Sequence, residues 1–293
     1  MEILALVKRN LRRFFRDKTA VLLSLVSVII MVILYGLFLA KVQADNIQGD
    51  LQRAGEALSD KNALYFINTW LMAGTMVVCI VNTVLSASQG FIKDVENGTN
   101  KDITLTPMAR YKLVASYMLS NALISFLMTC AVFVVSQIYI VAFGGRIMSF
   151  VNILYTLGIL LLCVFSFSCM VGYLATFLKS TGAFTAICAI TGVMIGFFAG
   201  IYLPIGMFPK AIQTILCLLP FTHAAMLFRI PFMHSATGAV FINDHAAQSI
   251  QKEFGLVMNV FGLDVTPAIA FAYIALIGAI FFILSIFRIS KKL

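Results

Sequence analysis

Six long apolar stretches that lack acidic, basic and histidine side chains place the strongest constraint on the fold of this 293-residue chain. They cover residues 19–40, 64–90, 113–143, 150–178, 180–203 and 268–287. A helix needs about 20 apolar residues to cross the hydrocarbon core of a bilayer, where irregular backbone would lose its hydrogen bonds. The stretches therefore predict an all-α integral membrane protein with six transmembrane helices.

The composition leaves no room for a large soluble domain beside these helices. Hydrophobic residues make up 61% of the chain and charged residues 11%, whereas soluble domains contain about 45–50% apolar and about 25% charged residues. We therefore expect residues 19–293 to form a single six-span domain, preceded by a separate element at residues 1–18.

The distribution of lysine and arginine predicts the orientation, because cytoplasmic segments retain positive charge during insertion. Of the 21 basic residues, 14 lie in one set of alternate segments, residues 1–18, 91–112, 179 and 288–293. The other set is longer in total, holds only 7, and comprises residues 41–63, 144–149 and 204–267. Both termini are therefore expected in the cytoplasm, and the net charge of +9 requires no nucleic-acid partner.

Residues 1–18 separate into two faces when they are placed on a helix at about 100° per residue. Phe14 and Phe15 belong to the apolar half, and the cationic half includes Arg9, Arg12 and Arg13. This pattern is typical of a helix that lies in the headgroup layer with its cations toward lipid phosphates. It predicts a cytoplasmic amphipathic interfacial helix with membrane lipid as its partner. The alternative is a basic tail that only fixes the topology.

The long outer segment at residues 204–267 stays hydrophobic through Phe232, and four prolines interrupt this hydrophobic part: Pro204, Pro209, Pro220 and Pro231. Residues 211–219, which lie between two of these prolines, are too few to cross the bilayer. A short apolar helix of this kind suits a re-entrant or interfacial position. We therefore predict an extracellular re-entrant or interfacial helical segment before the last span.

The predicted spans offer no carboxylate or imidazole for general acid–base chemistry, nor an ionisable residue near the midplane of the kind that ion-coupled carriers use. The chain lacks the GxxxxGK[ST] phosphate loop, and His223, His234 and His245 do not have metal-ligand spacing. We therefore expect no catalytic site, no metal and no cofactor bound by this chain. Active transport would require ATP and magnesium in a separate ATPase subunit.

The loop at residues 91–112 has a polar pattern that begins with an acidic residue and Gly-Thr and ends near Thr-Pro. Its key residues are Glu96, Gly98, Thr99, Leu105, Thr106, Pro107 and Arg110. With these residues the chain resembles the type-2 family of ATP-binding-cassette export permeases. The resemblance implies a short cytoplasmic coupling helix that docks on the ATPase, although Asn100 and Lys101 depart from the family pattern. The alternative is a solvated loop whose polar residues only mark topology.

The resemblance also implies a function and a set of partners. It implies a permease in the bacterial plasma (inner) membrane that exports an amphipathic or hydrophobic compound, such as a drug, peptide or lipid-like molecule, by alternating access. Two copies of an ATP-binding-cassette ATPase and a second permease chain, identical or homologous, are expected partners. A polysaccharide or lipid-linked glycan is the alternative substrate. An ion-coupled transporter or channel, or an intramembrane enzyme, is the alternative of a different class.

Two further sets of residues in the spans are candidates for assembly and for the pathway. Gly192, Gly196 and Gly200 form a smooth row at every fourth position, which favours close packing with a helix of the same chain or of a second copy. Polar residues in the second and third spans are candidates for lining the pathway: Asn68, Asn82, Thr83, Asn121 and Ser125. Hydrogen bonding between neighbouring helices is the alternative role of these polar residues.

Overall fold

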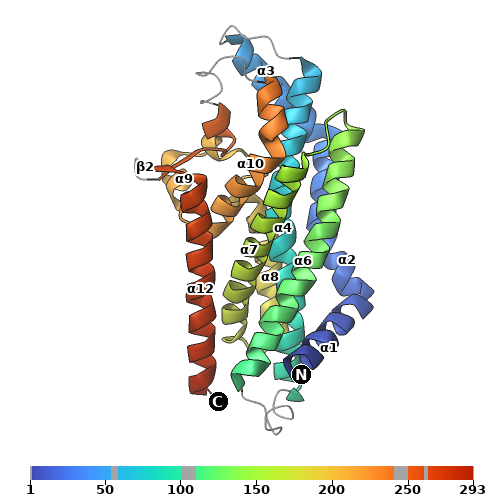
Figure 1. Ribbon diagram of the computed structural model, residues 1–293, viewed down its shortest axis with the longest axis vertical. Helices are drawn as coiled ribbons and strands as arrows, with labels where there is room; N and C mark the ends of the chain where they lie inside the picture. The colour runs from blue at the N-terminus through green and yellow to red at the C-terminus, as the bar shows by residue number, and fades with distance from the viewer. Residues whose placement is uncertain (1, 54–58, 100–109, 241–249, 261–262, 293) are drawn as a thin grey trace.

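Each of the six predicted apolar stretches is helical over most of its length in the computed structural model. The structure describes residues 2–53, 59–99, 110–240, 250–260 and 263–292. The two termini lie at one end of an elongated helical bundle, and α3 lies at the opposite end (Figure 1). The elements are α1 (Glu2–Arg16), α2 (Lys18–Leu34), the π-helical η1 (Tyr35–Leu39), α3 (Ala40–Arg53), α4 (Asp60–Glu96), α6 (Arg110–Ala142), α7 (Phe150–Ala175), α8 (Thr181–Phe198), the 3₁₀ turn η2 (Ile205–Met207), α9 (Lys210–Cys217), α10 (Pro220–Val240), β1 (Met258–Val260), β2 (Leu263–Val265) and α12 (Pro267–Lys292).

Within the described residues, five helices are long and apolar enough to cross a membrane: α4, α6, α7, α8 and α12. A further candidate is the pair α9 and α10, which meet at 85° as a broken span or a re-entrant loop. The first predicted span begins as α2, which has 17 residues, and continues through η1 into α3. The chain is therefore an all-α integral membrane protein apart from one small hairpin.

The long helix α4 forms the centre of the bundle. Its most apolar window is 94% buried within the protein, compared with 17% for α8 and 22% for α12. It packs against α2, α3, α6, α7, α8 and α10. The outward faces of the surrounding helices are rich in exposed apolar side chains, as expected of surfaces that contact lipid or another membrane protein.

Helix α8 ends earlier than the apolar stretch at residues 180–203 predicts. Ala199 is its C-cap, and Gly200 follows with a φ of 61°. A glycine in the left-handed conformation is a common helix terminator because it has no Cβ to clash. The next residues turn back toward the bundle, where the Tyr35 hydroxyl donates a hydrogen bond to the Ile201 carbonyl at 2.5 Å.

The outer segment contains more structure than its sequence indicated. The predicted short helix is present as α9, within two residues of the expected bounds at 211–219. The following helix α10, which was not predicted, packs against α4, α7 and α12. A two-stranded antiparallel hairpin, β1 and β2, pairs Met258 with Val265 and lies beyond α10. Within the described residues, the outer segment therefore packs on the bundle through α10.

Candidate functional site

A junction between three helices precedes the predicted coupling loop and is centred on Asp94, in the last turns of α4. The Asp94 side chain is 6% exposed, although the helix has nearly ended. Its carboxylate accepts hydrogen bonds from Arg9 Nη2 at 2.9 Å, from Arg13 Nη1 at 2.6 Å and from the Tyr117 hydroxyl at 2.5 Å. Charge-assisted bonds of this kind compensate the cost of burying a carboxylate. Asp94 therefore joins α1 and α6 to α4.

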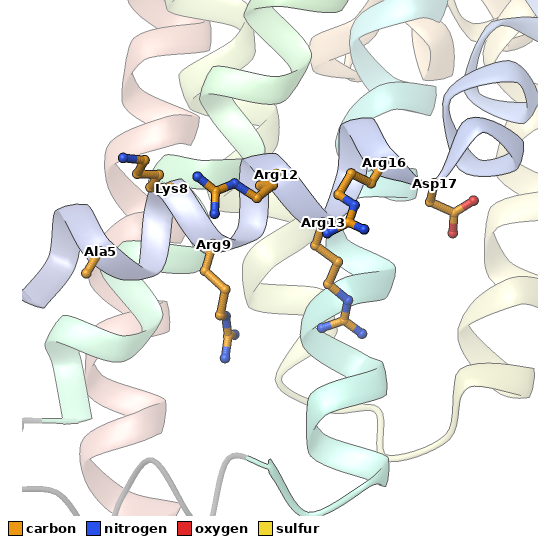
Figure 2. A pocket seen from close by; sticks show the side chains of 7 residues that line it. All are labelled: Ala5, Lys8, Arg9, Arg12, Arg13, Arg16 and Asp17. Atoms are coloured by element: carbon orange, nitrogen blue, oxygen red, sulfur yellow. The ribbon is translucent and has the colours of Figure 1, made fainter.

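The cationic side chains of α1 point in different directions. Arg9 and Arg13 extend from one side of the helix, whereas Lys8 and Arg12 extend elsewhere (Figure 2). Arg12 is exposed, while Arg9 and Arg13 are about two-thirds covered, with side chains 38% and 39% exposed. The cationic face expected from the sequence thus contributes two arginines to an internal ion-pair cluster.

The apolar side of α1 is also in contact with protein. Phe14 is 7% exposed and packs in a cluster with Ala87, Ile124 and Met128 of α4 and α6, whereas Phe15 is 42% exposed. Asn10 Nδ2 donates to Ser120 Oγ on α6 at 3.1 Å. Residues of both faces therefore fix α1 onto the bundle, whereas Phe15 stays exposed.

Two residues beyond Asp94, Glu96 links the end of α4 to the start of α8. Its Oε2 accepts hydrogen bonds from the Thr181 hydroxyl at 2.6 Å and from the Thr181 backbone N–H at 3.3 Å. Ser180 is the N-cap of α8 but makes no side-chain cap bond. Glu96 supplies the missing acceptor and places a negative charge at the positive end of the helix dipole.

The chain leaves α4 through Gly98, which has a φ of 75°. A Cβ built at this position would meet nothing within 4 Å, so the requirement for glycine is conformational. Thr99 is the last described residue before the gap at 100–109. Leu105, Thr106 and Pro107, and with them the predicted coupling helix, lie outside the described residues, while Arg110 begins α6. The described residues therefore include the root of the predicted coupling loop, where the chain leaves α4, but not its middle.

The glycines at every fourth position, Gly192 and Gly196 of α8 and Gly200 just after it, lie close to other residues of the same chain. A Cβ at Gly196 would lie 2.1 Å from Cε2 of Tyr202, and one at Gly200 would lie 2.5 Å from Cγ1 of Ile205. A Cβ at Gly192 would be 3.6 Å from Oδ1 of Asn82. The row permits close packing between α8, α4 and the turn after α8. Other α8 side chains, such as Ile190, are exposed.

The polar candidates in the second and third spans form buried hydrogen bonds, line cavities, or do both. Some join α4 to α6 by buried hydrogen bonds: Thr83 Oγ1 lies 2.8 Å from Ser125 Oγ, and Asn121 Nδ2 donates to Ser88 Oγ at 2.8 Å. Others line cavities. Asn121 also lines a cavity of about 140 Å³ between α1, α2, α4 and α6. Asn68 lines a cavity of about 390 Å³ at the opposite end.

Arg229 of α10, which is 0% exposed, was not among the residues singled out from the sequence. Its Nη2 donates to the carbonyls of Ala199 at 2.8 Å and Gly200 at 3.0 Å, and its Nη1 donates to the Gly255 carbonyl at 3.3 Å. Among the described residues no carboxylate forms an ion pair with it. The signal in the sequence was one arginine inside the largely apolar run between Pro220 and Pro231.

Comparison with known families identifies the class that these features define. The structure is a membrane-spanning helical bundle in which an amino-terminal helix is fixed to the end of the central helix α4. The ABC-2 type transporter family matches residues 1–233, from α1 to most of α10. The chain belongs to this family, whose members are the membrane subunits of ATP-binding-cassette transporters and work with an ATPase partner. Comparison with curated proteins gave no match.

Proposed function

We propose that this chain is the permease of an ATP-binding-cassette exporter, which moves an amphipathic or hydrophobic compound out of the cytoplasm. Alternating access is driven by ATP hydrolysis in two copies of a separate ATPase. The observation that carries this proposal is the junction at the end of α4. There the root of the coupling loop is bonded to α1 through Asp94 and to α8 through Glu96.

The junction supplies a route by which movement of the ATPase reaches the spans. A force applied to the loop acts first on the end of α4, because Gly98 follows that helix directly. Through Asp94 the same force acts on α1, and through Glu96 it acts on the first turn of α8. Since α4 packs against most of the bundle, its displacement reorganises several helix interfaces together.

The assembly that we propose places this chain in the bacterial plasma (inner) membrane with both termini in the cytoplasm, in accordance with its charge distribution. A second permease chain, identical or homologous, completes the pathway. The helices α8 and α12 are little buried and carry exposed apolar side chains, which suit them to lipid or subunit contacts. Membrane lipid contacts the exposed side of α1 at the cytoplasmic surface.

The test is reconstitution of the full chain with the ATPase that co-purifies with it from native membranes. Proteoliposomes are supplied with a fluorescent amphipathic dye, and its flux is measured with ATP, without ATP, and with an ATPase whose phosphate-loop lysine is replaced. The proposal expects flux only with ATP and the intact ATPase. Equal flux in all three conditions would contradict it and favour a channel or an ion-coupled carrier.

A further inference from the structure

A second cavity lies at the end of the bundle that is opposite the termini, where α3, the start of α4 and the end of α6 come together (Figure 1). Its volume of about 390 Å³ is within the range of pockets that hold drug-sized ligands. It is separate from the cytoplasmic junction, and none of the residues assigned to coupling lines it. Of the polar residues predicted to line a pathway, Asn68 is the one found here.

The charged groups of this outer cavity are predominantly acidic. Asp45 on α3 and Asp60 in the first turn of α4 both line it, together with one cation, Lys41. Gln48 Nε2 donates to Asp60 Oδ1 at 2.8 Å and so fixes that carboxylate relative to α3. All three charged residues are exposed, so Lys41 can extend into solvent while the carboxylates remain on short side chains. The cavity therefore favours a cation over an anion.

Aromatic side chains form the other part of the lining. The rings of Tyr139 and Phe143 on α6 have centroids 4.5 Å apart, and the Tyr139 hydroxyl donates to Asn68 Oδ1 at 3.3 Å. Phe38 lines the cavity as well, and 66% of it is exposed. Aromatic faces beside carboxylates recognise organic ammonium ions through cation–π and charge interactions. The apolar walls do not provide the oxygen cage that a small inorganic cation requires.

The backbone at this cavity departs from regular helix. Gly36 and Phe38, which both line it, belong to the π-helical turn η1 between α2 and α3. A Cβ at Gly36 would come within 3.4 Å of the Tyr139 hydroxyl, so the small residue lets α6 approach. Single π turns occur frequently at functional sites because they redirect side chains. Here the turn buries Tyr35 and leaves Phe38 exposed at the cavity.

We propose that this cavity binds a hydrophobic organic cation, such as a lipophilic ammonium or phosphonium ion. The carboxylates of Asp45 and Asp60 attract the charge, and Phe38, Tyr139 and Phe143 contact the apolar substituents. The proposal deepens the proposed function, on which it rests for the claim that the bound cation is a transported substrate. Binding itself is independent of the ATPase.

The experiment compares two probes of the same shape and opposite charge, tetraphenylphosphonium and tetraphenylborate. Equilibrium binding is measured on the purified full-length permease in lipid nanodiscs without ATPase. We expect saturable binding of the phosphonium ion that weakens as salt increases, and weaker binding of the borate. Asp45→Asn and Asp60→Asn should each reduce phosphonium affinity about fivefold, and Tyr139→Leu about threefold.

Matched variants separate loss of the site from loss of the fold. Asp264→Asn removes an exposed carboxylate from β2, outside the cavity, and should bind as the wild type does. Asp45→Glu retains the charge and should restore most of the affinity that Asp45→Asn loses. Equal binding of both probes, absence of phosphonium binding by the wild type, or unchanged affinity in both Asn variants would overturn the proposal. Binding at the site without ATP-dependent flux of the phosphonium ion would instead contradict only its role in transport.

Discussion

The guanidinium carbon of Arg229 lies 5.4 Å from the ring centre of Trp70, so that a fully buried cation of α10 rests against the largest buried side chain of α4. Trp70 Nε1 in turn donates to the Phe254 carbonyl at 3.0 Å, next to the Gly255 carbonyl that Arg229 contacts. The two residues hold the end of α8, the helix α10 and the turn at residues 254–255 against the central helix.

Replacing Arg229 with Met should destabilise the outer end of the bundle. Three carbonyls would lose their donors, and each unsatisfied buried polar group costs about 1–3 kcal/mol. We expect a loss of about 3 kcal/mol or more in the free energy of unfolding and a lower melting temperature in detergent. The stability of Arg229→Lys should lie between those of the wild type and Arg229→Met, because a single ammonium group cannot reproduce the planar fork of the guanidinium group. A wild-type melting temperature for Arg229→Met would show that these bonds contribute nothing.

Asp94→Asn should loosen the attachment of α1 without preventing membrane insertion. The variant leaves Arg9 and Arg13 without their carboxylate, and the expected cost is about 1–3 kcal/mol because both guanidinium groups are partly exposed. Hydrogen exchange in residues 2–16 is the measurement, and it should accelerate. Asp17→Asn is the control, since Asp17 caps α2 through Ala20 N–H and is exposed. Unchanged exchange in the Asp94 variant would contradict the proposed attachment.

Substitution of Glu96 should affect coupling in an order set by charge. Glu96→Gln keeps an acceptor for Thr181 but loses the favourable charge at the start of α8, which is worth about 0.3–1 kcal/mol. Glu96→Lys reverses that charge and should reduce ATP-driven flux more strongly, while membrane abundance stays normal. Complex formation, hydrolysis and flux are measured together on the reconstituted transporter. Equal flux in both variants and the wild type would remove Glu96 from the coupling route.

Gly98→Val should impair coupling through backbone strain alone. A β-branched residue at a φ of 75° costs about 1–2 kcal/mol or more, so the loop would leave α4 in a different direction. Gly90→Ala is the matched control, because a Cβ there also meets nothing within 4 Å but the residue lies within regular helix. We expect Gly98→Val to associate less with the ATPase, and we expect Gly90→Ala to associate as the wild type does. Full association of both variants would contradict the role of this turn.

The orientation can be tested with single cysteines at Ser59, Thr99 and Ser290. A membrane-impermeant thiol reagent applied to intact cells should label position 59 and spare positions 99 and 290, which are expected on the cytoplasmic side. After permeabilisation all three should react. Labelling at 99 with protection at 59 would invert the proposed topology.

The helices could be predicted from the sequence because each depends on local composition. A run such as residues 268–287 is uncharged throughout, and it corresponds to α12. The short helix α9 was also recognisable, because prolines flank an apolar segment too short to span. Helix α10 was not, since its apolar surface is interrupted by Arg229, and only the fold shows that this side chain donates to backbone carbonyls.

The contacts of the junction depend on residues far apart in the chain, and no local pattern encodes them. Amphipathicity placed Phe14 and Arg13 on different faces of α1, but it could not distinguish lipid from protein as the surface that each face contacts. Glu96 was selected because it matches a family motif, but its hydrogen-bond partner Thr181 is 85 positions away in the sequence. The pairing of β1 with β2 was missed because each strand has only three residues.

The length of α4 has a mechanical consequence. With 37 residues it measures about 55 Å at 1.5 Å per residue, whereas the hydrocarbon core is about 30 Å thick. One uninterrupted helix therefore carries Asp60 at one extremity and Asp94 and Glu96 at the other. A tilt of about 5° about one end would displace the other by about 5 Å. In the transporter that we propose, the helix acts as a lever arm: a small angular change at the end that carries Asp94 and Glu96 alters the cavity beside Asp60 without breaking any bond along the helix.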